Sequence, residues 1–356
     1  MRLALLFFFL STASCGWDHH DWLTEASLRG LSLGDATALY EPLDSALQRS
    51  GTGLSVRDTE GLVRHLKLNT HYIFENKLEE SLGVGVFVKS ILSMYSDEPD
   101  WGADQNLFES DQYPELWTED TPYISQKTGL GSQGFRHMYF PGKLNWWEPI
   151  GSFQIPQHAI GEAPSRAQIY WDLAQAMKRA GADYWSYRFL AWSLHYVQDL
   201  FQPFHSRQTP SKSFIEFKLK WWVIPSIDVE ATADQIAYYH LGYEAWVTHE
   251  LERDPKLKEI LAQGSLPENP HLPIDAYLMD EVVPFAASNA SALADRLMQV
   301  LPKPGHQPGR KPKEEIGTET WWQGVQLGDR AGRLREISEN LMEALGKLTR
   351  YLVQSL

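Results

Sequence analysis

The sequence predicts an all-α protein, a multi-helix domain with long loop insertions. Apolar residues recur at helical spacing in several segments, whereas no segment shows the strong alternation that marks a half-buried strand. With 356 residues, 43% of them hydrophobic, the chain can bury a substantial core. Irregular segments rich in glycine, proline and aspartate separate the periodic ones and predict the loops.

The N-terminal half is expected to combine helices with one long irregular region. Mixed helical periodicity occupies Trp22–Leu33 and Thr59–Leu92. Residues 95–165 have no consistent period and are rich in glycine, proline, aspartate and aromatic residues. Long loops of this kind in a compact domain usually carry functional residues, so we expect part of the site there.

Four later segments are expected to be helices, at residues 164–180, 182–201, 228–251 and 328–353. Ser165 is a candidate cap for the first of them. The second is apolar around much of its circumference, which is typical of a central buried helix. Residues 207–226 are expected to form an irregular connection between two helices. Residues 302–314 are rich in proline, glycine and basic residues, which indicates an exposed linker.

The first sixteen residues have the pattern of an export signal. Arg2 precedes the apolar run Leu3–Leu10, which is too short to span a membrane, and small residues follow. Cleavage before Trp17 fits these small residues and is the favoured scheme. Lipoprotein processing at Cys15 is the alternative and would leave a lipid anchor. We therefore expect an exported protein, secreted or periplasmic, without a disulfide, because Cys15 is its only cysteine.

The net charge of −14 bears on the class of ligand. Proteins that bind nucleic acid along its phosphate backbone usually present a basic face. A long nucleic-acid footprint is therefore not expected, although the charge is compatible with cleavage of a short strand. The sequence leaves the oligomeric state open.

Residues 195–205, His-Tyr-Val-Gln-Asp-Leu-Phe-Gln-Pro-Phe-His, are the most informative segment of the chain. His195 and Asp199 are four residues apart, so a helix places both side chains on one face. Pro203 ends that helix, because the residue before a proline is disfavoured in the α region. His205 follows the break, where the turning chain can bring its imidazole back towards the helix end.

His240 and Glu244 repeat the four-residue spacing on the next predicted helix. Imidazole and carboxylate groups are the ligands that zinc prefers alongside thiolates. Two pairs on helix faces and a histidine at the break between helices therefore predict a metal site.

These segments resemble a known family. Residues 190–205 resemble the core signature of the zinc-dependent phospholipase C family, which is related to the P1-type nucleases, and residues 239–247 resemble its second metal-binding helix. The resemblance implies a mostly helical domain that holds three zinc ions and hydrolyses phosphate esters. We expect the phosphoesterase domain to span residues 17–301, followed by the linker at 302–314 and a C-terminal helical segment at 315–356.

The resemblance supplies further ligands from the N-terminal half. It implies one zinc held by Asp100, His137, His195 and Asp199, a second by His205, His240 and Glu244, and a third by Trp17, His20 and Asp199. Trp17 would bind through its free α-amine and carbonyl, and Asp199 would bridge two metals. His19 in place of His20 and Asp97 in place of Asp100 remain alternatives.

Closely spaced zinc ions lower the pKa of a bound water and hold the phosphoryl oxygens as negative charge develops. The resemblance implies that Asp100 also acts as a catalytic residue, orienting or deprotonating the attacking water. The tryptophan pairs Trp146–Trp147, Trp221–Trp222 and Trp321–Trp322 fall in or beside predicted loops. There they would meet a lipid surface, a choline headgroup or a nucleobase, unless they belong to the core.

The favoured hypothesis is a zinc-dependent phospholipase C that cleaves glycerophospholipids at a membrane surface. Glu244 favours it, since the resemblance associates aspartate at this position with the nuclease branch, and the acidic charge agrees. A P1-like single-strand nuclease or nucleotidase is the second hypothesis, and a non-catalytic zinc- or lipid-binding relative is the third. The intervals from His20 to Asp100, from Asp100 to His137 and from His205 to His240 are longer than in compact family members and would reshape substrate access.

Overall fold

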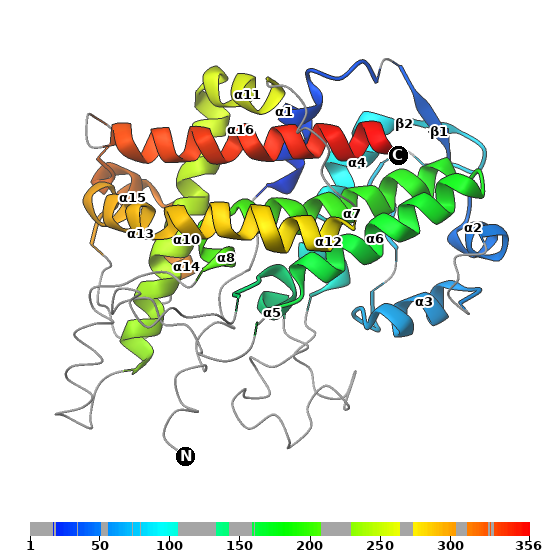
Figure 1. Ribbon diagram of the computed structural model, residues 1–356, viewed down its shortest axis with the longest axis horizontal. Helices are drawn as coiled ribbons and strands as arrows, with labels where there is room; N and C mark the ends of the chain where they lie inside the picture. Colours follow the sequence, from blue (N-terminus) through cyan, green and yellow to red (C-terminus); the bar gives the residue numbers. More distant parts are fainter. Residues whose placement is uncertain are drawn as a thin grey trace.

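The prediction of an all-α protein is confirmed by the computed structural model, in which most described residues are helical (Figure 1). The structure describes residues 17, 19–33, 35–50, 56–72, 74–78, 80–105, 133–141, 159, 161–207, 229–263, 273–303, 312–326, 328 and 331–356. Residues 1–16, including Cys15, and the pairs Trp146–Trp147 and Trp221–Trp222 lie outside these ranges.

Short elements make up the N-terminal half. They are α1 (His20–Leu28), β1 (Thr37–Leu39), α2 (Leu43–Ser50), α3 (Thr59–Leu66), β2 (Gly85–Phe87), α4 (Val88–Ser96), the π-helical turn η2 (Pro99–Ala103) and α5 (Gln133–His137). β1 and β2 pair antiparallel, with Ala38 opposite Val86. Strands of three residues are too short to show alternation in a sequence, which is why they were not predicted.

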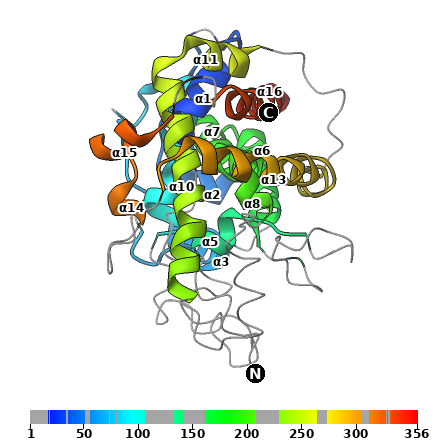
Figure 2. The ribbon, with the colours of Figure 1, turned by 90° about the vertical axis from the view of Figure 1, so that its left-hand side faces the viewer.

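Longer helices dominate the C-terminal half. They are α6 (Ala163–Arg179), α7 (Asp183–Phe201), α8 (Pro203–Ser206), α10 (Val229–Arg253), α11 (Pro255–Ala262), α12 (Ile274–Tyr277), η4 (Leu278–Val282), α13 (Val283–Val300), α14 (Pro312–Glu315), α15 (Glu319–Gly324) and α16 (Gly332–Ser355). α6, α7, α13 and α16 run along the long axis of the molecule, and α10 crosses them steeply (Figures 1 and 2). No helix in the described ranges is long and apolar enough to cross a membrane.

Helix α7 lies at the centre of the molecule, as its composition predicted. It packs against α1, α4, α6, α8, α13 and α16. Every residue of α7 except Asp183 and Tyr187 is buried. The helix ends at Phe201, and Pro203 then begins the short helix α8, so His205 lies on a separate helical turn directly after the predicted break.

Three local predictions need correction. Residues 59–92 are not continuously helical, because α3 ends at Leu66, where Lys67 adopts a left-handed conformation with φ 53°, and β2 precedes α4. The helix that contains Trp22 begins at His20 and ends at Leu28, so residues 29–33 are not helical. Ser165 does not cap α6, which begins two residues earlier, and its hydroxyl instead donates to the carbonyl of Glu162.

The pair Trp321–Trp322 does not lie in a loop. Both residues belong to α15, and Trp321 is 2% exposed. Its indole Nε1 donates to the hydroxyl of Tyr238 on α10 at 2.8 Å. A tryptophan buried and bonded in this way stabilises the packing of α15 and is not available to a lipid surface.

Candidate metal centre

The sequence-predicted ligand side chains converge from six helical elements. They are His20 at the start of α1, Asp100 on η2, His137 at the end of α5, His195 and Asp199 on α7, His205 on α8, and His240 and Glu244 on α10. In α1 the buried face follows helical spacing, with His20 in line with Leu23, Thr24 and Ser27. The histidine therefore enters the core together with the apolar side of its helix.

The first group of ligand atoms comprises Asp100, His137, His195 and Asp199. His137 Nδ1 lies 2.9 Å from Asp199 Oδ2, 2.9 Å from His195 Nε2 and 3.5 Å from Asp100 Oδ1. His195 Nε2 is 3.4 Å from Asp199 Oδ2. Ligands of a tetrahedral zinc with bonds of about 2.0–2.1 Å lie roughly 3.3 Å from one another, so these separations fit one ion.

The second group comprises His205, His240 and Glu244. His205 Nε2 lies 2.9 Å from His240 Nε2 and 3.7 Å from Glu244 Oε1, and His240 Nε2 lies 2.9 Å from the same oxygen. Gln202 donates its amide to Glu244 Oε1 at 3.0 Å, which fixes the carboxylate in place. The break at Pro203 thus brings His205 to the face of α10 that carries the helical pair.

The third group contains His20. Its Nε2 lies 3.5 Å from Asp199 Oδ1 and 3.8 Å from Asp100 Oδ2. Trp17 is buried nearby, and its indole Nε1 donates to the carbonyl of Gln198 at 2.8 Å. The contact anchors the side chain of Trp17, whereas metal binding by its α-amine remains a prediction.

Asp199 lies between these groups. Its Oδ2 faces His137 and His195, and its Oδ1 lies 3.5 Å from His20 Nε2 and 3.3 Å from His205 Nδ1. The residue is fully buried in the last turn of α7. One carboxylate can therefore give one oxygen to each of two neighbouring ions.

In four histidines, one ring nitrogen is held by a hydrogen-bond acceptor. The contacts are His20 Nδ1 to Gln198 Oε1 at 2.8 Å, His137 Nε2 to Asp104 Oδ2 at 3.1 Å, His195 Nδ1 to Ser96 O at 2.7 Å, and His205 Nδ1 to His137 O at 2.8 Å. In each case this nitrogen donates a hydrogen bond to the acceptor, so the other ring nitrogen is the one that can bind a metal ion once it is deprotonated. Metal-binding histidines are held in this way.

The inner atoms form a set of acceptors that need a cation or a proton. The facing nitrogens of His137 and His195, and of His205 and His240, are only 2.9 Å apart. His20 Nε2, Asp199 Oδ1 and Glu244 Oε2 are buried and have no hydrogen-bond partner among the described residues. Buried polar atoms without partners are costly, so this donor set of nitrogen and oxygen atoms fits bound metal ions.

The pKa values of the metal-free centre reflect the burial and the close spacing of its ionisable groups. Burial lowers the pKa of His137, but the carboxylates of Asp199 and Asp100 outweigh it and raise that pKa to about 10. Burial raises the pKa of Asp100 to about 7. Protons therefore compensate the charge of the centre, and a metal ion must displace them.

The alternative ligands His19 and Asp97 lie apart from these groups. His19 Nδ1 is 3.5 Å from Asp21 Oδ1, its side chain is 44% exposed, and its ring stacks on Trp22. Asp97 forms a cluster with His19 and Asp21 instead of joining the three central groups. The side chains that face the centre are those of His20 and Asp100. His19 precedes α1 in a left-handed conformation with φ 79°, and Asp97 follows the last residue of α4, before η2 begins.

Three residues of the centre were not singled out in the sequence. Gln198 and Gln202 lie inside the 195–205 motif, where their spacing from His195 and Asp199 was the available signal. Asp104, which contacts His137, lies four residues after Asp100 and has no motif of its own. Its contact crosses 33 residues of sequence, which no local pattern reveals.

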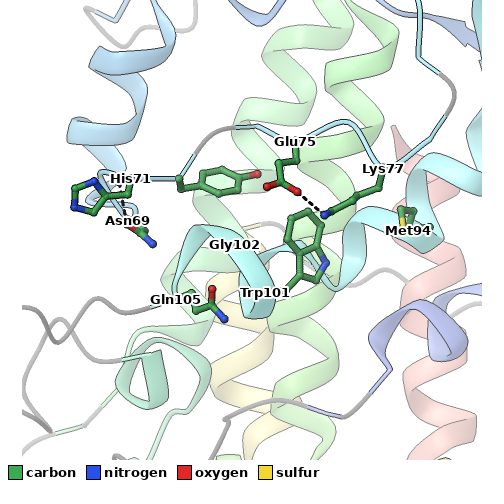
Figure 3. A pocket seen from close by; sticks show the side chains of 9 residues that line it. Asn69, His71, Glu75, Lys77, Met94, Trp101, Gly102 and Gln105 are labelled. Atoms are coloured by element: carbon green, nitrogen blue, oxygen red, sulfur yellow. Dashed lines mark hydrogen bonds and ion pairs between the residues drawn. The ribbon is translucent and has the colours of Figure 1, made fainter.

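A cavity of about 460 Å³ adjoins the segment that carries Asp100 (Figure 3). Trp101 forms part of its wall, with Lys77 Nζ 4.7 Å from the centre of the indole ring and joined to Glu75. Its walls contain none of the ligand residues, so the cavity lies beside the metal centre and does not include it.

No known protein-family model matches the chain, and neither a curated protein nor a solved structure matches it.

Proposed function

We propose that this protein is an exported zinc-dependent phosphodiester hydrolase of the phospholipase C type, with a phospholipase C/P1 nuclease-like helical fold and three zinc ions. The observation that carries the proposal is the position of Asp199, whose two oxygens face different groups of buried ligand atoms. A structural zinc site closes four ligands around one ion and does not need a shared carboxylate. Several ions held side by side suit phosphoester hydrolysis.

The ligand groups are compatible with the sets that the family resemblance implies, and His195 also lies close to His20 and Asp199. Asp100, His137, His195 and Asp199 would hold one zinc, and His205, His240 and Glu244 a second. His20 and Asp199, with the amine and carbonyl of Trp17, would hold the third. Bound zinc supplies an activated water at neutral pH and neutralises the charge of the phosphoryl oxygens.

Asp100 is the residue we assign to general-base catalysis. Its side chain is 19% exposed, whereas Asp199 and Glu244 are fully buried, so it is the ligand carboxylate that water can reach. The amide of Gln133 donates to Asp100 Oδ1 at 2.8 Å and holds the group in orientation. Held in this way, its carboxylate can orient the attacking water and accept its proton.

The proposed substrate is a glycerophospholipid at a membrane surface, cleaved to diacylglycerol and a phosphorylated headgroup. Two features support a lipid over a nucleic acid: Glu244 in the second ligand group, and the net charge of −14, which opposes binding of a long polyanion. The phosphate of a single lipid headgroup can instead be recognised by metal ions alone.

The test combines metal analysis with two substrates. We expect about three zinc ions per chain, release of phosphorylcholine from phosphatidylcholine vesicles, and little cleavage of single-stranded DNA. His240→Ala should abolish the activity, whereas His249→Ala, which alters a half-buried histidine against Trp322, should not. Cleavage of DNA without phospholipid hydrolysis would establish the nuclease alternative, and zinc binding without either activity would establish a non-catalytic protein.

A further inference from the structure

Asp104 is a fully buried carboxylate at the end of the turn η2. Its Oδ2 lies 3.1 Å from His137 Nε2 and also accepts a hydrogen bond from the hydroxyl of Tyr196. Its Oδ1 accepts a hydrogen bond of 2.7 Å from Arg136, which is itself buried. Charge-assisted bonds of this kind keep the carboxylate ionised and fix its direction. Asp104 is thus held in place to accept a hydrogen bond from Nε2–H of His137.

The opposite side of the His137 ring faces the candidate metal centre. Nδ1 lies 2.9 Å from Asp199 Oδ2 and 3.5 Å from Asp100 Oδ1. The other histidines of the centre face it through Nε2, as the contacts of His20 and His195 illustrate. The ring of His137 therefore has the opposite orientation to the rings of His20 and His195. Its Nδ1 faces the centre, and its Nε2 lies on the outer side, where it contacts Asp104.

We propose that Asp104 is a positioning residue that keeps the proton of His137 on Nε2 and thereby presents Nδ1 as the metal ligand. The inference rests on the proposed function in so far as it needs a metal ion beside Asp100, His137 and Asp199. A carboxylate on the outer nitrogen fixes the ring orientation and raises the basicity of the ligating nitrogen. Removing such a partner typically weakens metal binding by about 10–100-fold.

Nuclear magnetic resonance of the zinc-loaded wild-type protein tests the assignment directly. With ¹⁵N-labelled histidine, long-range ¹H–¹⁵N correlations identify the nitrogen of each ring that carries a proton, and His137→Gln identifies the signals of His137. We expect a protonated Nε2 and a metal-bound Nδ1 for His137 alone. A His137 ring bound through Nε2, or not bound to zinc at all, would overturn the proposal.

Metal affinity provides the second test. Asp104→Asn is combined with Arg136→Gln, so that no unpaired guanidinium remains buried. Competition with a chelator should show one zinc bound about 10–100-fold more weakly, and Asp104→Glu should recover part of the loss. The matched control is Glu250→Gln with Arg335→Gln, which removes another carboxylate–arginine pair that contacts no ligand histidine.

The outcomes separate the two proposals. Wild-type zinc affinity in the Asp104 variant, or an equal loss of affinity in the control, would refute a positioning role. If the Asp104 variant does not fold, the resonance experiment on the wild type still decides. A zinc-loaded protein with the expected His137 tautomer that hydrolyses no phosphodiester would contradict only the proposed function.

Discussion

At the scale of single residues, Asp199 has the greatest influence on the candidate centre. Its two carboxylate oxygens face different ligand groups, and Oδ1 has no hydrogen-bond partner among the described residues. Glu244 contacts the histidines of the second group and the amide of Gln202. The two carboxylates should therefore differ in how many metal ions depend on them.

We predict that Asp199→Asn loses two of the three expected zinc ions, whereas Glu244→Gln loses one. The reason is that Asp199 contributes to two ligand groups and Glu244 to one. Elemental analysis after dialysis measures the zinc content of both variants. Equal losses in the two variants would show that Asp199 does not bridge.

Zinc binding should also release protons and strengthen as the pH rises. His137, with a pKa raised to about 10, is protonated in the metal-free protein at pH 7, and Asp100, with a pKa raised to about 7, is partly protonated. Both groups must lose protons to bind metal, so affinity falls as the pH decreases through 7. Titration calorimetry in buffers of different ionisation enthalpy should detect at least one proton released per chain, and a heat independent of the buffer would contradict this.

At the scale of secondary-structure elements, close helix contacts set the position of the ligands. α16 packs against α1 and α11, and α1 begins with His20. At Gly346 a Cβ atom would lie 2.1 Å from the carbonyl oxygen of Leu261 in α11. At Gly332, near the start of the same helix, the corresponding position meets no neighbouring helix or loop among the described residues.

Gly346→Ala should destabilise the protein by about 1–3 kcal/mol, because the backbone of α11 has to move away from the added methyl group. Gly332→Ala is the matched control in the same helix and should be neutral or stabilising by up to about 1 kcal/mol. Urea denaturation of the two variants measures the difference. Equal stability would mean that α11 and α16 are less closely packed than described.

At the scale of the whole molecule, the candidate centre joins segments from both halves of the chain. α1, η2 and α5 supply ligands from the N-terminal half, and α7, α8 and α10 supply the remainder. Metal ions bound there would therefore connect these elements in addition to the hydrogen bonds and side-chain packing between them. Ligands that bind the native state alone stabilise it by mass action.

Removal of metal by a chelator should lower the melting temperature of the wild-type protein by more than about ten degrees, and added zinc should restore it. Each ion present at about 1,000 times its dissociation constant contributes about 4 kcal/mol. Calorimetry with and without chelator measures the shift. Asp199→Asn, which has fewer ions to lose, should show a smaller shift, and an equal shift would indicate that metal stabilises the fold from elsewhere.

Much of the fold and part of the centre follow from local sequence. The buried helix around residues 182–201, its end before Pro203, and the same-face pairs His195/Asp199 and His240/Glu244 were predictable, because helical periodicity and the steric effect of proline act over a few residues. The strands β1 and β2 were not, since their three-residue lengths carry no pattern and their pairing depends on distant contacts.

The sequence by itself determined the helical class, the residue types of a metal centre and the helix faces that carry them. Only the tertiary structure decided that His20 and Asp100 face inward while His19 and Asp97 do not, and that Asp104 contacts His137. The reason is physical: helix spacing acts within a few residues, whereas these choices depend on how α1, η2 and α5 pack around α7 across the length of the chain.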